Sequence, residues 1–261
     1  MCQTKNSVRV KNVLREFFLK RLSVYLSERG LGTRRGLDRQ IQCEGVKVNG
    51  VLLFNPAHKV SASDTLVWQG KLVGGKPQKT RLWAYYKPKG VVVSHDDPQK
   101  RLTLYDKLRN TLPDNILKGL SAVGRLDYAS EGLILLTNSG KLKRYLEHPQ
   151  NRIKRTYRVR FRGRLPDNYA ALSRQGLTVQ GVVYAAFEMR VCEGGKKTYQ
   201  NAELTLSEGK NREIRRIFKH WGCEVLRLER VRYGPFYLNN GERDAVVLQD
   251  LSLLKGFVFS D

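Results

Sequence analysis

The chain has 261 residues, 41% of them hydrophobic, and a formal net charge of +24 at neutral pH. This length suggests one or two domains, and this apolar share is enough for a packed core, which excludes a disordered basic tail. The positive surplus favours contact with phosphates, so nucleic acid is the leading partner. An anionic membrane surface is the alternative, although no apolar run approaches the length of a membrane span and no lipidation motif is evident.

The four cysteines and four histidines are scattered along the chain, and no two cysteines form a C-x-x-C pair. We therefore expect no metal site, and isolated cysteines in a chain of this length are typical of reduced thiols inside a cell. These residues are Cys2, Cys43, Cys192, Cys223, His58, His95, His148 and His220.

Residues 1–17 precede the first helical pattern and are basic, with Glu16 as their one acid. We predict a basic arm that touches RNA. An organelle transit peptide is the alternative, because such peptides are also basic and poor in acids. The expected location is the bacterial cytoplasm, with a mitochondrial or plastid matrix as the alternative.

Residues 18–70 predict two helices followed by a small sheet. Thr33 can cap the second helix, and Gly45 can end it. The dipeptide Asn49-Gly50 between valine-rich runs predicts a hairpin. The apolar face of the first helix consists of Phe18, Leu22, Tyr25 and Leu26, and that of the second of Leu37 and Ile41.

The second helix carries Arg34, Arg35 and Arg39 away from its core face, where they can meet RNA or simply face solvent. The motifs around them are Arg21-Leu22, Tyr25-Leu26, Thr33-Arg34-Arg35, Gln40-Ile41 and Glu44-Gly45-Val46-Lys47-Val48-Asn49-Gly50. In this order they resemble the S4 RNA-binding domain over residues 18–70. The resemblance implies RNA binding, with Arg34 and Arg35 among the substrate-binding residues, but no particular reaction.

Residues 71–79 are rich in Gly and Lys and contain Pro77, a composition typical of a linker, so we place the second domain at residues 80–261. Strand patterns dominate there, helices are interspersed, and the rhythm of a parallel sheet is missing. This indicates an α+β fold with a mixed, mostly antiparallel sheet and flanking helices. The expected strands are 82–86, 91–93, 153–164, 202–207 and 225–231, and the expected helices are 103–108, 142–146 and 214–221.

A short polar turn holds Asp127 directly before an apolar strand at residues 133–136. A carboxylate at the end of a rigid element is well placed for a site. In so basic a chain, it suggests chemistry on a polyanion. The alternative is an aspartate that only caps backbone amides of its turn.

Two other features could serve such a site. Tyr157 lies on the inward-facing row of an alternating strand, so it is either a core residue or a wall for an extruded base. The turn at residues 207–216 leads into a helix whose first turn is cationic, which is unfavourable unless an anion lies nearby. An ordinary exposed basic turn is the alternative.

Four motifs then point to one family. They are Lys87-Pro88-Lys89-Gly90; Gly124-Arg125-Leu126-Asp127 with Ser130-Glu131-Gly132-Leu133 and Thr137-Asn138; Lys154-Arg155-Thr156-Tyr157; and Glu208-Gly209-Lys210-Asn211-Arg212-Glu213-Ile214-Arg215-Arg216. Their order and spacing are similar to those of RNA pseudouridine synthases of the RsuA/RluB type, which also carry an N-terminal S4 domain.

The resemblance implies roles for single residues. Asp127 would be the catalytic carboxylate, Tyr157 would contact the target base, and Arg215 would form a buried ion pair with Asp127. The other implied substrate-binding residues are Arg125, Ile214 and Lys87. The chain departs from the family at two positions: Tyr86 stands where asparagine is common, and Glu213 where glutamine is frequent.

The implied reaction isomerises a specific uridine of ribosomal RNA to pseudouridine, without redox change and so without a cofactor. Large-subunit RNA is favoured, because residues 230–235 resemble those of large-subunit members. We expect a monomer. The alternatives are a synthase acting on small-subunit RNA or, more remotely, transfer RNA, and a non-catalytic RNA-binding or ribosome-assembly factor. An S4-bearing methyltransferase would need a glycine-rich cofactor loop, and the sequence offers none.

Overall fold

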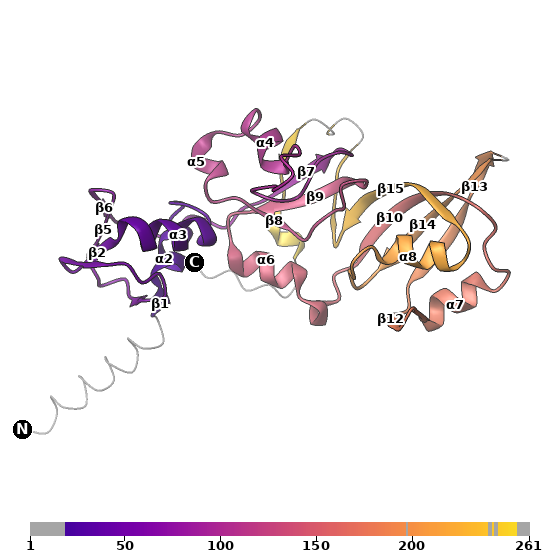
Figure 1. Cartoon of the computed structure of the whole chain (residues 1–261), viewed down its shortest axis with the longest axis horizontal. Coiled ribbons are helices and arrows are strands. Elements are labelled where there is room, and N and C mark those ends of the chain that lie inside the picture. Colours follow the sequence, from indigo (N-terminus) through magenta and orange to yellow (C-terminus); the bar gives the residue numbers. More distant parts are fainter. Residues whose placement is uncertain (1–18, 197, 240–241, 243–244, 255–261) are drawn as a thin grey trace, which may run out of the picture. The chain divides into compact units, whose positions relative to one another are not determined.

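The computed structural model of the chain describes residues 19–196, 198–239, 242 and 245–254, and its elements are labelled in Figure 1. The expected basic arm at residues 1–17, and Phe18 after it, lie outside the described residues. The chain forms two compact units. The N-terminal unit extends to Lys79 and includes Asp114–Leu120, and the larger unit comprises Thr80–Pro113 and the chain from Ser121 onward. None of the described helices is long and apolar enough to cross a membrane.

The N-terminal unit combines helices with a four-stranded antiparallel sheet. As predicted, Thr33 caps the second helix, where its Oγ1 accepts a hydrogen bond from Gly36 N at 3.3 Å. The hairpin at Asn49-Gly50 also forms, with both residues at positive φ. The helices are α2 (Leu22–Glu28), α3 (Arg34–Glu44) and α5 (Asp114–Leu117); the sheet order is β3 (Val51–Leu53), β2 (Val46–Val48), β5 (Leu66–Trp68), β6 (Lys71–Val73); and β1 (Lys20–Arg21) pairs with β4 (Lys59–Val60).

Two local predictions differ from the structure in this unit. The first helix begins only at Leu22, because Lys20–Arg21 pairs as a strand with Lys59–Val60. Strand β6 occupies the start of the expected linker, since a second hairpin turn at Gln69 and Gly70, both at positive φ, returns the chain to the sheet. Gln-Gly is a weaker turn signal than Asn-Gly, and the glycine- and lysine-rich composition hid the strand.

The larger unit is built on a mixed sheet in which the described strands pair antiparallel except for β15 with β9. This confirms the predicted α+β class. The main order is β13 (Glu188–Lys196), β14 (Tyr199–Leu206), β10 (Arg155–Arg162), β15 (Glu224–Tyr233), β9 (Glu131–Thr137), β7 (Leu82–Lys87), β17 (Val246–Leu248). Strand β16 (Phe236–Tyr237) pairs with β15, β8 (Ser121–Val123) with β9, and β11 (Leu177–Val179) with β12 (Val182–Tyr184).

The parallel pairing of β15 with β9 joins two halves of this sheet, and we call it the seam. It consists of two residue pairs, Glu229 with Glu131 and Arg230 with Gly132. Gly132 has φ +106°, and a Cβ on it would lie 2.3 Å from the carbonyl oxygen of Arg230. A side chain there would both strain the backbone and force the strands apart. The close approach of the two halves therefore depends on glycine.

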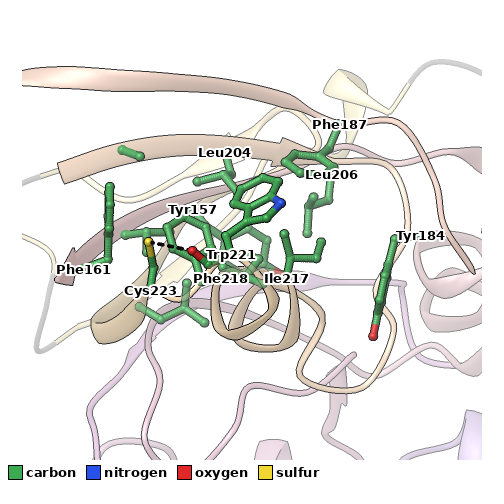
Figure 2. Packing of buried hydrophobic residues seen from close by; sticks show 14 of the residues in the cluster. Tyr157, Phe161, Tyr184, Phe187, Leu204, Leu206, Ile217, Phe218, Trp221 and Cys223 are labelled. Carbon is green, nitrogen blue, oxygen red and sulfur yellow. Dashed lines mark hydrogen bonds between the residues drawn. The ribbon is translucent and has the colours of Figure 1, made fainter. Parts of the chain in front are cut away.

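Helices flank the sheet: α8 packs beside β15, α6 beside β8, and α7 beside β13. The predicted apolar face of α8 is buried, and Ile217, Phe218 and Trp221 from it join a cluster that also contains Tyr157 (Figure 2). The helices of this unit are α4 (Leu104–Arg109), α6 (Gly140–Glu147), α7 (Tyr169–Gln175) and α8 (Glu213–His220), with 3-10 turns at Pro149–Asn151 and Leu251–Leu253.

The strand expected at residues 91–93 does not form. Val92 makes only an isolated bridge to Thr103. The carbonyl of Val91 instead accepts a hydrogen bond from the Lys87 ammonium at 2.9 Å. Lys87 thus occupies the Val91 carbonyl, while the backbone of Val92 forms hydrogen bonds to the two residues that flank Thr103.

Candidate active site

A cleft of about 930 Å³ opens on the larger unit, and most of its charged lining residues are basic. A cleft of this size can admit a nucleotide. The cations that line it are Arg101, Arg125, Lys143, Arg155, Lys210, Arg212 and Arg230, and the carboxylates are Asp127, Glu147, Glu208 and Glu213.

Three of these four carboxylates accept a hydrogen bond from a backbone N–H group. Glu147 Oε1 accepts a hydrogen bond from Gly124 N at 2.6 Å. Glu208 and Glu213 accept theirs from Ala185 N at 2.7 Å and Lys210 N at 2.9 Å. Among the described residues, no backbone N–H donates to the Asp127 carboxylate, whose side chain is 33% exposed. Asp127 is therefore the carboxylate of the cleft that accepts no backbone hydrogen bond from the described residues.

The backbone around Asp127 is fixed from several sides. We call residues 124–130 the Asp127 loop. Ser130 N donates to Asp127 O at 3.0 Å, and Gly90 N donates to Tyr128 O at 2.9 Å. Strand β9 begins immediately after the loop, so the carboxylate lies at the end of a buried strand, as the sequence suggests. A rigid loop of this kind can present a side chain with little reorganisation.

Arg215 holds the Asp127 loop by its backbone. Its Nη2 donates to Ala129 O at 3.1 Å, and its Nη1 donates to Val225 O at 3.1 Å. Burial lowers the pKa of Arg215, as does the nearby Arg212 cation, whereas the Asp127 charge raises it. Arg215 therefore interacts electrostatically with the Asp127 carboxylate, but its guanidinium donates hydrogen bonds to backbone carbonyl groups.

The direct partner of Asp127 is Arg212, whose Nη1 lies 4.0 Å from Asp127 Oδ2. The expected ion pair of Asp127 with Arg215 is not among the ion pairs of the described residues, and both members of the observed pair are partly exposed. Arg212 has φ +51°, a left-handed conformation that non-glycine residues rarely adopt, at the N-terminal boundary of α8. Sequence motifs do not reveal this backbone reversal.

Tyr157 lines the cleft and also belongs to the core cluster, with 9% of it exposed. Its neighbour across the ladder is Arg230, which is in turn opposite Gly132. Ile214 at the start of α8 also lines the cleft and is buried. Strand β10 and helix α8 thus bring an aromatic and an aliphatic wall to the cleft that contains Asp127.

Arg230 lines the cleft, although its sequence motif predicts no role for it in the site. It is buried, and its Nε donates to Leu133 O at 2.8 Å and its Nη1 to Arg125 O at 3.4 Å. The guanidinium thus links the seam to the Asp127 loop through Arg125 O. Arg125 itself is exposed in the cleft, where it can meet RNA.

Lys87 does not contact the cleft. It is fully buried, and its Nζ donates to Pro88 O at 2.8 Å and to Val91 O at 2.9 Å. Burial lowers its pKa to about 8, while the Glu131 and Asp127 charges act in the opposite direction. The structure therefore does not place Lys87 among the residues that line the cleft, and its enclosed ammonium holds the turn before Val91.

Glu213 is a buried carboxyl group at the start of α8. Burial is the main cause that raises its pKa to about 7, and the neighbouring Glu208 charge adds to the effect. Its Oε2 accepts from Lys210 N, and its Oε1 has no hydrogen-bond partner among the described residues. This carboxyl holds the turn that carries Arg212.

The two other expected substrate-binding residues, Arg34 and Arg35, lie in the N-terminal unit, exposed on α3. Within the described part of the chain, no group of three or more histidine, cysteine or acidic side chains could hold a metal ion.

The chain matches known proteins over both units. Residues 81–220 match the model of the family described as RNA pseudouridylate synthase. The chain is 39% identical, over 85% of its length and 93% of the relative's, to an uncharacterized RNA pseudouridine synthase of Rickettsia felis. It is 36% identical to ribosomal large subunit pseudouridine synthase B of Buchnera aphidicola, over 88% of this chain and 90% of the relative.

The fold agrees with these matches. A solved crystal structure of a pseudouridylate synthase superimposes with a TM-score of 0.62 at 25% identity, covering 89% of this chain and 96% of that one. The chain therefore belongs to the RNA pseudouridine synthase family and is an enzyme that isomerises uridine in RNA.

Proposed function

We propose that the enzyme acts on ribosomal RNA of the large subunit and that Asp127 is its catalytic carboxylate. The relatives named ribosomal large subunit pseudouridine synthase B support the choice of RNA. The observation that carries the catalytic role is the availability of Asp127: the other carboxylates lining the cleft accept backbone hydrogen bonds, and this one faces Arg212 instead.

The reaction breaks the bond from N1 of uracil to C1′ of ribose, turns the base, and forms a bond from C5 to C1′. C5 loses a proton and N1 gains one, so atoms balance without a redox partner. An ionised carboxylate assists at the base or the ribose. The Arg212 guanidinium lies 4.0 Å from the Asp127 carboxylate, and Arg215 is held beside the same loop.

The target uridine must leave its stack to reach this carboxylate, at a cost of a few kcal/mol. In our proposal Tyr157 contacts the extruded base, Ile214 closes the apolar wall, and Arg125 meets a phosphate. The N-terminal unit acts as an S4-type module that binds RNA through Arg34 and Arg35. Its contribution would be affinity, because exposed cations contact phosphates without reading sequence.

The decisive test uses large-subunit RNA transcribed with uridine tritiated at C5, because isomerisation releases that tritium. Asp127→Asn should lower the release rate by at least roughly a thousandfold while RNA affinity stays within about threefold. Asp167→Asn is the matched control, since Asp167 is exposed and pairs with the exposed Arg164. It should keep full activity.

Carbodiimide-blocked reverse transcription of the same RNA would then locate the product. A single new stop in large-subunit RNA supports the proposal, and a stop only in small-subunit or transfer RNA overturns the choice of substrate. If Asp127→Asn loses RNA binding together with activity, the aspartate has a structural role and the catalytic assignment fails.

A further inference from the structure

Tyr128 follows Asp127 directly, and the proposed mechanism does not use it. The residue lines the cleft, and 48% of it is exposed. Exposed rings are common on protein surfaces. This ring, however, belongs to a loop whose backbone is fixed, because Tyr128 O accepts the hydrogen bond from Gly90 N. Its position relative to the carboxylate is therefore defined.

Arg101 packs over one face of the Tyr128 ring. The guanidinium carbon of Arg101, which also lines the cleft, lies over the Tyr128 ring at 5.5 Å from its centroid. Arg101 is itself clamped by Asp97, with Nε–Oδ2 at 2.9 Å and Nη2–Oδ1 at 2.7 Å. A two-point clamp of this kind orders a side chain that would otherwise move freely.

We propose that Tyr128 and Arg101 form a stacking platform for an unpaired RNA base adjacent to the uridine held at Asp127. This inference rests on the proposed function and deepens it. Aromatic faces stack with any base, which makes them suitable for single-stranded RNA. Arg101 stabilises the stack as a cation over the ring.

The cleft favours RNA over a protein side chain as the occupant. Arg125, Lys210 and Arg212 line the same cleft as Tyr128 and supply positive charge for phosphates. Eversion of the target uridine also leaves its neighbour without one stacking partner. A ring one residue away from the reactive carboxylate can replace that partner, which lowers the cost of eversion.

The chain contains a matched control for this platform. Tyr237 on β16 is 53% exposed, and the guanidinium carbon of Arg232 lies 5.7 Å from its ring centroid. It has the same chemistry as Tyr128 but is not among the residues that line the cleft. Any effect of a lost surface tyrosine that is unrelated to the cleft should appear equally at Tyr237.

The first test titrates the full-length protein against a ten-nucleotide oligouridylate that contains one 2-aminopurine, whose fluorescence falls when it stacks. Wild type and Tyr128→Phe should quench it. Tyr128→Ala and Tyr128→Leu should lose the quenching and bind about tenfold or more weakly. Tyr237→Ala should behave as wild type, and thermal melting should show that the variants are folded.

A double-mutant cycle separates stacking from a direct phosphate contact. Arg101→Ala should weaken binding in wild type but have little further effect in Tyr128→Ala, because it acts through the ring. Additive losses would instead assign Arg101 to a phosphate and overturn its part in the platform.

On large-subunit RNA, Tyr128→Ala should raise KM about tenfold and change kcat less than twofold at saturating RNA. If Tyr128→Ala and Tyr237→Ala have equal quenching and equal KM, the platform does not exist. If Asp127→Asn keeps tritium release but Tyr128 is needed for quenching, the catalytic proposal fails and the platform stands. The two ideas can thus fail separately.

Discussion

The two units of this enzyme treat electric charge in opposite ways. In the N-terminal unit the described buried residues are apolar apart from Ser23 and Ser61, and the arginines of α3 are exposed. Among the described residues, the larger unit buries the charged residues Lys87, Arg155, Glu213, Glu229 and Arg230. Buried charges are costly, so their presence indicates a task that exposed charges cannot perform.

The hydrogen bonds of the larger unit show what that task is. Arg230 and Lys87 donate to backbone carbonyls, as does the half-buried Arg215 beside them. These cations hold the loops around Asp127 rather than touch the substrate. In our proposal the exposed arginines of the N-terminal unit contribute affinity for RNA phosphates. Buried cations thus position backbone in the larger unit, whereas the described charged residues of the N-terminal unit are not buried.

Of the changes that test this comparison of the two units, Arg215→Lys should have the largest effect. A lysine keeps the charge but cannot bridge Ala129 O and Val225 O at once, so the Asp127 loop loses a brace. We expect kcat to fall about a hundredfold with KM changed less than threefold, because a small displacement of a catalytic group has an effect of that size. Single-turnover kinetics on large-subunit RNA would measure it.

The adjacent Arg216→Lys is the matched control. Arg216 is exposed on α8, and its Nη2 donates to Asn211 Oδ1 at 3.5 Å. It should leave kcat unchanged. Equal losses in both variants, or a rise in KM without a fall in kcat at Arg215, would contradict the positioning role.

Glu213→Gln should have the next largest effect, and it depends on pH. The pKa of Glu213 is raised to about 7 in the folded protein, so the folded state holds a proton that the unfolded state releases between about pH 4.5 and 7. The stabilisation is complete at low pH and is lost as pH rises through 7. Glutamine removes this loss, so the variant should be more stable at pH 8 by roughly 1–3 kcal/mol.

Urea unfolding at pH 5 and pH 8 would measure this difference, which should shrink at the lower pH. Glu224→Gln is the control, because Glu224 is exposed. The interpretation fails if Glu213→Gln destabilises the protein equally at both pH values.

The smallest effect per residue is expected in the N-terminal unit. Arg34→Ala with Arg35→Ala should weaken RNA binding by about 1 kcal/mol in total and reduce the slope of log affinity against log salt by about 1.4–1.8, with kcat and unfolding unchanged. Filter binding at several salt concentrations would measure it.

Lys59→Ala with Lys71→Ala removes the same charge from other exposed positions of this unit. If that pair lowers affinity as much as the arginine pair does, α3 is no special docking surface, and only net charge matters.

The strength of local patterns decided how much the sequence could predict. Helix α8 and strand β10 were predictable, because each has a complete apolar face. The site was harder. The motifs predicted that Asp127, Tyr157 and Ile214 lie together, and all three line one cleft. The ionic partner of Asp127, however, depends on the left-handed backbone of Arg212. The burial of Lys87 depends on the tertiary fold. A basic residue in a motif does not tell whether its charge will face RNA or a carbonyl.

The sequence did not predict strands β11, β12, β13 and β17, because none of them has a sustained alternation of apolar and polar residues. Strand β13, Glu188–Lys196, mixes charged residues with glycines and is fixed by its ladder to β14. Such edge elements gain their structure from neighbours rather than from their own periodicity.

The glycine of the seam has a consequence for how the enzyme can evolve. Asp127 precedes β9 and Tyr157 lies on β10, so their separation is set by the contact of β9 with β15, which Gly132 permits. Insertions and substitutions in the outer loops can alter which RNA is accepted without changing the pairing of β9 with β15. Lineages that diverge in target can therefore inherit the same spacing of acid and aromatic ring for as long as position 132 stays without a side chain.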